Sequence, residues 1–540
     1  GIWMNTQRPE WNDANNALVG YGVSVVTLAQ LRRYLVFLRP LLVAMPGRTV
    51  RVSSAVADFA ESLAGIFGRC AAEAAQIAAD PQARRRAVDE LSTAGSRYRM
   101  RVYAEGLGGP CPVATRRLVE LVDAALVLVD ASLRAARRPD GLFHAYRLLS
   151  FGEEGTLPLR DLGPMLEGQV AVLGSGLLQP DEAVDLLRAL RQSALYRSDQ
   201  HTYLLYPDGC PAGFLRRNTI PPAVLDRVPF LRVLLEAGDD RLVVRDAEGV
   251  VRFHPDLVNE AALEARLQRL AGDPRWSESV AQAADAVRFA YEDVFQHRAF
   301  LGRSGTMFAY EGLGSVYWHM VSKLLVAVQE AHRAAVRAGH AAVPALAEAY
   351  FEIRGGLGFN KTPAEYGAFP SDPYSHTPGH AGAQQPGMTG QAKEGVLVRL
   401  GELGVSVEEG CLRFTPALLR DREFARDPHS LRGFDASGRE VETELAAETL
   451  AFTVCGTPVV YRLGHGLSAV EVRATLATGE AAVFQDGVLS AELSAAVFLR
   501  AGRVRRIEVA VPASQIHATM HSCARKPAFD APRGSDAAAI

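Results

Sequence analysis

Apolar residues recur at helical spacing along most of the chain before residue 404. Apolar positions three and four residues apart predict amphipathic helices that pack on a shared core. Proline and glycine separate these segments, and Asp181, directly after Pro180, is a favourable helix start. The predicted helices cover 21–42, 53–79, 84–104, 114–138, 159–173, 181–195, 260–270, 277–297, 320–335 and 389–403.

The pattern changes in three places. Residues 196–222 and 351–391 are rich in Pro, Gly and Tyr and lose all periodicity, which predicts long loops of the kind that line binding sites. Residues 241–254 alternate as a small hairpin. Towards the end, two-residue alternation predicts strands at 412–414, 449–454, 459–463, 469–476, 481–484, 496–499 and 505–511.

These patterns predict a mainly α protein with an added β domain. We expect a helical (α/α)-type toroid or bundle over 1–404, a β-sandwich over 405–520 and a flexible tail over 521–540. A Rossmann sheet is not predicted, because strands do not alternate with the helices.

Composition and net charge limit the kinds of partner that the chain is expected to bind. A chain of 540 residues is too long for one core, and its 48% hydrophobic and 22% charged residues are ordinary for a globular protein. A net charge of −3 gives no general attraction to nucleic acid or anionic membranes. The longest apolar run, 23–44, is interrupted by Arg32, Arg33 and Arg39, which disfavours a membrane span.

The six cysteines form no C-x-x-C pair, which disfavours a zinc ribbon, a redox motif or a disulfide framework. No secretory signal is visible. Reduced thiols and the absence of such a signal predict a cytoplasmic protein, although the first residue is Gly1 and not Met.

The first candidate site is the stretch Pro-Glu-Trp-Asn-Asp-Ala-Asn-Asn at 9–16. Two carboxylates, three amides and one indole within eight residues are typical of sugar sites, where an aromatic face meets a ring and polar groups meet hydroxyls. Either carboxylate, Glu10 or Asp13, is a candidate for the chemistry, and Trp11 and Asn12 are candidate sugar contacts. A polar turn that caps the following helix explains the same residues equally well.

Two further segments carry candidate chemistry. Residues 304–319 are glycine-rich and contain Glu311 and His319, although a lone histidine on an apolar helix is more often part of a core. Residues 371–391 end at Thr389-Gly390, a helix start of the kind that binds anions, and Thr389 is equally suited to be only the cap. His376 and His380 do not make a metal site, because no third ligand is apparent and they do not share a helix face.

In this order the segments resemble the catalytic part of glycoside hydrolase family 94, the cellobiose phosphorylase family. That family has a Trp-Asn-Asp stretch before a long helix, matched here by 11–13; a Glu-x-Gly segment ending in an aromatic residue and His, matched by 311–319; and a Thr-Gly pair opening a late helix, matched by 389–390. The resemblance spans roughly 11–419 and implies an (α/α)6 barrel, complete or partial.

The resemblance also implies roles for individual residues. Asp13 would be the general acid in a glycosyl transfer to phosphate, which inverts a β-glucosidic linkage and releases a sugar 1-phosphate. Phosphate would be the co-substrate, and neither a further cofactor nor a metal is implied. Two sets of binding residues would be Trp11, Asn12, Glu311 and Trp318 for sugar, and His319, Thr389 and Gly390 for phosphate.

Two alternatives remain open at this stage. In an inverting hydrolase on the same barrel, a carboxylate such as Glu311, Glu365 or Asp372 would activate water opposite Asp13. Alternatively, the chain would be a non-catalytic carbohydrate-binding or scaffold part. The family's helices before the acid, and a phosphate-binding arginine on them, have no counterpart here, so we expect an N-terminal half of the same protein or a homodimer partner to complete the site.

Overall fold

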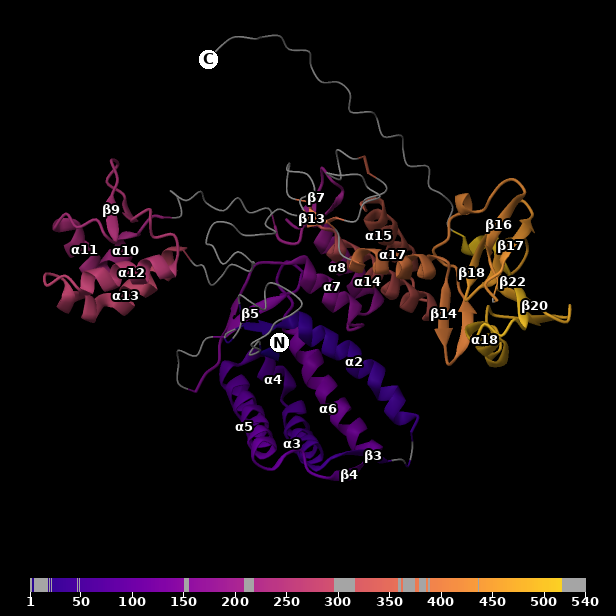
Figure 1. Cartoon of the computed structure of the whole chain (residues 1–540), viewed down its shortest axis with the longest axis horizontal. Coiled ribbons are helices and arrows are strands. Elements are labelled where there is room, and N and C mark those ends of the chain that lie inside the picture. The colour runs from indigo at the N-terminus through magenta and orange to yellow at the C-terminus, as the bar shows by residue number, and fades with distance from the viewer. Residues whose placement is uncertain are drawn as a thin grey trace, which may run out of the picture. The chain divides into compact units, whose positions relative to one another are not determined.

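The fold is described from a computed structural model of the chain. The structure describes residues 2–3, 18, 20, 22–45, 47, 49–149, 155–207, 218–295, 316–357, 361–362, 374–377, 385–386, 389–435 and 437–516. The chain divides into two compact units, Gly1–Glu394 and Gly395–Ile540 (Figure 1).

The first unit is mainly helical, as predicted. Its helices before the inserted segment are α2 (Val25–Val43), α3 (Ser54–Ala71), α4 (Ala74–Ala79), α5 (Pro81–Glu105), α6 (Thr115–Arg134), α7 (Leu166–Gly174) and α8 (Pro180–Gln192). Figure 1 shows α3 between α5 and α6, and α3 packs against both of them. The helix predicted over 159–173 is wrong in its first turn, because Leu159–Asp161 forms the strand β6.

Helix α2 begins where its sequence provides a cap. The Ser24 hydroxyl accepts a hydrogen bond from the Thr27 backbone N–H at 2.9 Å, which satisfies one of the free donors of the first turn. Residues Gly22–Ser24 before it form strand β2, in a four-stranded sheet of order β1-β2-β5-β6 with β1 (Ile2–Trp3) and β5 (Tyr146–Leu149). The predicted helix over 21–42 therefore starts later than its apolar pattern does.

Later in the first unit lie α14 (Trp318–Arg337) and α15 (Val343–Gly355), and α17 (Thr389–Glu402) extends from it into the second unit. Helix α14 packs against α7, α8 and α15. Its buried positions include Val321, Leu324, Leu325 and Val328, which follow the spacing of three and four residues that predicted the helix.

An inserted segment, 218–295, has a core of its own. It contains α10 (Pro222–Arg227), α11 (Pro229–Glu236), the hairpin β9 (Val243–Arg245) and β10 (Val251–Phe253), α12 (Glu260–Ala271) and α13 (Ser277–Phe295). All the buried apolar residues of one core cluster, from Ile220 to Phe295, belong to this segment. The predicted hairpin at 241–254 is confirmed, and α10 and α11 are additional to the prediction.

The second unit is built on one five-stranded sheet of order β18-β19-β22-β20-β21. Its strands are β18 (Thr449–Val454), β19 (Thr457–Gly464), β20 (Glu471–Leu476), β21 (Ala481–Phe484) and β22 (Val504–Pro512). Because β19 and β22 are parallel, the sheet is mixed, so the predicted β domain is confirmed as a mixed β-sheet. Leu412 and Phe414, which precede this sheet in the chain, are buried in the same core as its strands.

The strand predicted at 496–499 is wrong, because these residues end helix α18 (Ala491–Phe498) and the turn after it. Ser490 caps this helix by accepting a hydrogen bond from the Leu493 backbone N–H at 3.3 Å. The two hairpins beside the sheet are β14 (Val405–Glu408) with β15 (Cys411–Phe414), and β16 (His429–Phe434) with β17 (Glu440–Leu445).

Two predictions about the whole chain concern its helices. The helices within the described ranges do not close into a barrel, so the toroid is confirmed only as a mainly helical unit. Of these same helices, none combines the length and apolar character that a membrane crossing needs. The predicted tail 521–540 lies outside the described residues.

Candidate functional site

Helices α2 and α7 run in the same direction. Both start beside Ala145: its carbonyl accepts a hydrogen bond from the Val25 backbone N–H at 2.9 Å, and a Cβ at Gly168 would lie 3.0 Å from its Cα. At the other end of α7, Arg33 of α2 donates to the Gly174 carbonyl at 3.1 Å. The two helices therefore begin at the same end of the unit.

Helix α14 shares this direction. Helices α7 and α8 form one antiparallel pair and α14 and α15 another, since each pair is joined by a short connection. Ion pairs hold α8 alongside α15, with Asp181 contacting His340 at 3.7 Å and Arg191 contacting Glu352. Because the first contact joins the starts of these helices and the second their ends, α8 and α15 are parallel, and so are α7 and α14.

The alignment of α7 and α14 places Glu167 and His319 at nearly the same height along the two helix axes. A Cβ at Gly174 would lie 3.7 Å from the Ala327 Cβ, so these residues are neighbours. Eight residues earlier on each parallel helix, about 12 Å along the axis, are Leu166 and His319. The starts of α2, α7 and α14 thus lie together at one end of the unit, which we call the site end.

The structure joins two of the segments that the sequence identified. Strand β11 (Val316–Tyr317) pairs with β12 (Tyr374–Thr377), and Tyr317 lies opposite His376. Strand β13 (Gln385–Pro386) extends the same small sheet on the other side of β12. Residues 316–319 are therefore close to residues 374–377, as a shared site requires.

His319 also contacts helix α17. Its Nε2 lies 3.2 Å from the Oε2 of Glu394, whose side chain is only 9% exposed. Neither atom has an aligned hydrogen bond with another described residue, so the contact is an electrostatic one. On the other side of the ring, the Tyr317 hydroxyl lies 3.5 Å from Nδ1, and the two rings meet edge to face. His319 of α14 is thereby held against the first turns of α17.

The surroundings of His319 favour its neutral form. Burial lowers the pKa of His319, and the positive charge of Lys323 lowers it further, while the Glu394 carboxylate acts in the opposite direction. A histidine of this kind can donate or accept one hydrogen bond, and its protonated form becomes more favourable when an anion binds beside it.

The other predicted site residues divide into two groups. Trp318 is wholly buried at the start of α14, where its side chain forms part of the core, and Thr389 and Gly390 are the first two residues of α17. The structure brings His319 close to α17 through Glu394, and so close to the helix that Thr389 and Gly390 open. Outside the described residues lie Trp11, Asn12, Asp13, Glu311, Glu365, Asp372 and His380.

The ends of the segment that contains Asp13 are nevertheless fixed. Strands β1 and β2 flank residues 4–21 and pair with each other, with Ile2 opposite Ser24. Strand β2 then pairs with β5, with Ser24 opposite Tyr146. Since Ser24 caps α2, both ends of this segment lie at the site end.

Glu167 is a functional candidate that the sequence analysis missed. It lies in the first turn of α7, is buried, and its Oε2 accepts a hydrogen bond from the Tyr146 hydroxyl at 2.8 Å. A buried carboxylate is costly without such a donor and is common at sites that handle protons or sugar hydroxyls. The available signal was a glutamate in a mostly apolar run, Met165 to Leu173, whose other polar residue is Gln169.

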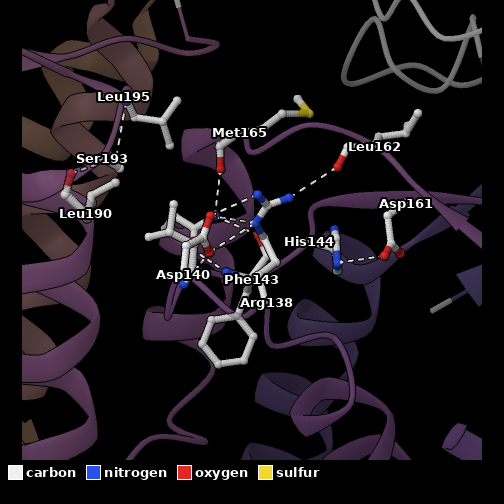
Figure 2. A network of polar contacts seen from close by, with 12 residues as sticks. Arg138, Asp140, Phe143, His144, Asp161, Leu162, Met165, Leu190, Ser193 and Leu195 are labelled. Atoms are coloured by element: carbon white, nitrogen blue, oxygen red, sulfur yellow. Dashed lines mark hydrogen bonds and ion pairs between the residues drawn. The ribbon is translucent and has the colours of Figure 1, made fainter.

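A second buried titratable group is His144, which contacts Asp161 in strand β6 of the sheet β1-β2-β5-β6 (Figure 2). The His144 Nε2 lies 3.4 Å from the Asp161 Oδ2, and Arg147 donates to the same carboxylate at 2.6 Å. Burial lowers the pKa of His144, with Asp161 opposing that effect and Arg147 and Arg138 adding to it. Since Arg147 already pairs with Asp161, we interpret His144 as a structural residue.

Within the described ranges, no group of three or more His, Cys, Asp or Glu side chains is placed to hold a metal ion. Cys70, Cys111, Cys411 and Cys455 are free thiols.

One comparison with known proteins bears on function. Residues 211–298 match the family model for GH149 phosphorylase insertion domain 2. The matched range includes the inserted segment 218–295 and its separate core. GH149 is a glycoside phosphorylase family related to GH94, so the match indicates a glycoside phosphorylase that binds a sugar and phosphate. No curated protein matches the chain.

Proposed function

We propose that the chain is an inverting glycoside phosphorylase, which cleaves a β-glucosidic linkage with phosphate and releases a sugar 1-phosphate. The observation that carries this proposal is the match of residues 211–298 to a phosphorylase insertion domain. The pairing of β11 with β12 and the contact between His319 and Glu394 support it, because they bring the predicted phosphate-binding segments together.

In this proposal Asp13 protonates the glycosidic oxygen as the bond to the anomeric carbon breaks. Phosphate attacks that carbon from the opposite face, so one carboxylic acid and one anion site are sufficient. The sugar contacts are Trp11, Asn12 and Glu311, while Trp318, which is wholly buried, packs in the core at the start of α14. His319, Thr389 and Gly390 bind phosphate, since a histidine and the free N–H groups of a helix start suit an anion.

The helix directions support the finer fold assignment in the proposal. In an (α/α)6 barrel, successive helices alternate in direction and one set of ends surrounds the site. Here α2, α7 and α14 are parallel, α8 and α15 are antiparallel to them, and His319 and the two strands that flank residues 4–21 lie at the starts of the first set.

Phosphate dependence tests the proposal. The purified chain is incubated with β-linked glucooligosaccharides of several linkages, with and without inorganic phosphate, and the products are followed by NMR. We expect sugar 1-phosphate with the α configuration, formed only when phosphate is present. Equal turnover without phosphate would support the hydrolase instead, and oligosaccharide binding without turnover in either condition would support a non-catalytic role.

A further inference from the structure

Lys323 occupies a position on α14 that the resemblance to family 94 does not assign. It lies four residues after His319, so both side chains project from the same face of the helix. Helical side chains lean towards the N-terminus, which directs the Lys323 ammonium back towards His319 and the site end. Its positive charge is one of the influences that lower the pKa of His319, which agrees with this short separation.

Lys323 also lacks a counterion among the described residues. It is partly buried, yet no hydrogen bond or ion pair joins it to any residue that the structure describes. Two carboxylates of α14 and α17 are already engaged: Glu394 contacts His319 at 3.2 Å, and Glu330, further along α14, accepts two hydrogen bonds from Arg33 at 2.7 Å each. A partly buried ammonium without a partner favours the binding of an external anion.

We propose that Lys323 binds the phosphate co-substrate together with His319, and that Glu394 positions the His319 ring. This inference rests on the proposed function. It supplies the cationic group that an anionic nucleophile needs. Lysine suits the role as a compact point charge on a flexible stem, which can follow phosphate as it attacks.

The test compares three variants of the full chain. Lys323→Met removes the charge and keeps the stem, Lys323→Arg keeps the charge, and Arg333→Met removes an exposed charge about 15 Å further along the same helix. Michaelis constants are measured separately for phosphate and for the oligosaccharide, and phosphate binding is measured by calorimetry with inorganic phosphate alone.

We expect Lys323→Met to raise the KM for phosphate about tenfold or more, which is the loss of one charge-assisted contact. The KM for oligosaccharide should change less than about twofold, a split that a general loss of structure would not give. Lys323→Arg should retain most of the phosphate affinity, and Arg333→Met should match the unmodified chain in both constants.

The outcomes separate the inference from the proposed function. If the unmodified chain turns over only with phosphate and Lys323→Met leaves the phosphate constant unchanged, the inference is wrong and the function stands. If the unmodified chain neither binds nor uses phosphate, the proposed function is wrong. Should Lys323→Met fail to fold by circular dichroism, Lys323→Gln and Lys323→Arg decide the question on the same criteria.

Discussion

The helical part of the first unit and the inserted segment 218–295 bury different kinds of groups. Among the described residues of the helical part, the buried side chains include the titratable groups His144, Glu167, His332 and Glu394. In the inserted segment the buried polar residue is Asn218, whose amide exchanges two hydrogen bonds with the Phe253 backbone at 2.7 and 2.8 Å.

The difference is informative because burying a titratable group costs free energy that a structural amide avoids. Gln169 in the helical part satisfies the Phe143 backbone in the same way as Asn218 satisfies Phe253, so both regions use amides as structural residues. Two buried carboxylates of the helical part, Glu167 and Glu394, lie near the starts of α7 and α17, whereas Asp239 of the inserted segment is neutralised by an ion pair with Arg241. We therefore propose that the chemistry lies in the helical part and that the inserted segment is a separately stabilised module.

The largest expected effect concerns the proposed acid. Asp13→Asn should lower kcat by about 10²–10⁴-fold, because the amide keeps the shape of the carboxyl group but cannot donate the proton. Oligosaccharide binding, measured by calorimetry, should remain close to that of the unmodified chain. Asp240→Asn is the matched control, since Asp240 is an exposed carboxylate of the inserted segment. Unchanged kcat in Asp13→Asn would remove the acid assignment.

The second prediction tests the independence of the inserted segment. Leu231→Ala truncates a side chain that is 0% exposed in α11 and should destabilise the segment by about 2–5 kcal/mol. Val233→Ala, two residues away and 44% exposed, should cost much less. Calorimetric unfolding should show one transition lowered while the others stay in place. A uniform shift of every transition would mean that the segment does not fold separately.

Sequence patterns predicted most of the elements but not how they meet. The spacing of apolar residues identified α5, α12, α13 and α14, because long amphipathic helices repeat their pattern several times. It misassigned 496–499, where a short apolar run is compatible with either a strand or a helix. The capping residue Ser490 was a better guide than the run itself.

The site shows the same limit. His319, Thr389 and Gly390 could be selected from residue types and their order, whereas Glu394 and Glu167 depend on which helix ends lie side by side. The pairing of β11 with β12 joins residues far apart in the chain through backbone hydrogen bonds. Backbone pairing of two-residue and four-residue strands leaves no periodicity in the side chains, so the sequence alone could not predict it.

The third prediction concerns the phosphate site. His319→Ala should raise the KM for phosphate about tenfold while changing the KM for oligosaccharide less, because the side chain is proposed to contact only the anion. Glu394→Gln should give a smaller change in the same direction, since it loosens the ring without removing it. Larger effects on the oligosaccharide constant than on the phosphate constant would place His319 in the sugar site.

The smallest effect on activity is expected for a substitution of His144. This prediction compares a structural titratable group with the proposed functional ones. Because burial lowers the pKa of His144, the unfolded chain binds a proton below about pH 6.5 that the folded chain does not. The free energy of unfolding should therefore fall as the pH falls through that value. His144→Gln should flatten this dependence and leave kcat unchanged, whereas His201→Gln, at an exposed position, should not flatten it. The same slope in His144→Gln would mean that His144 is protonated equally in both states.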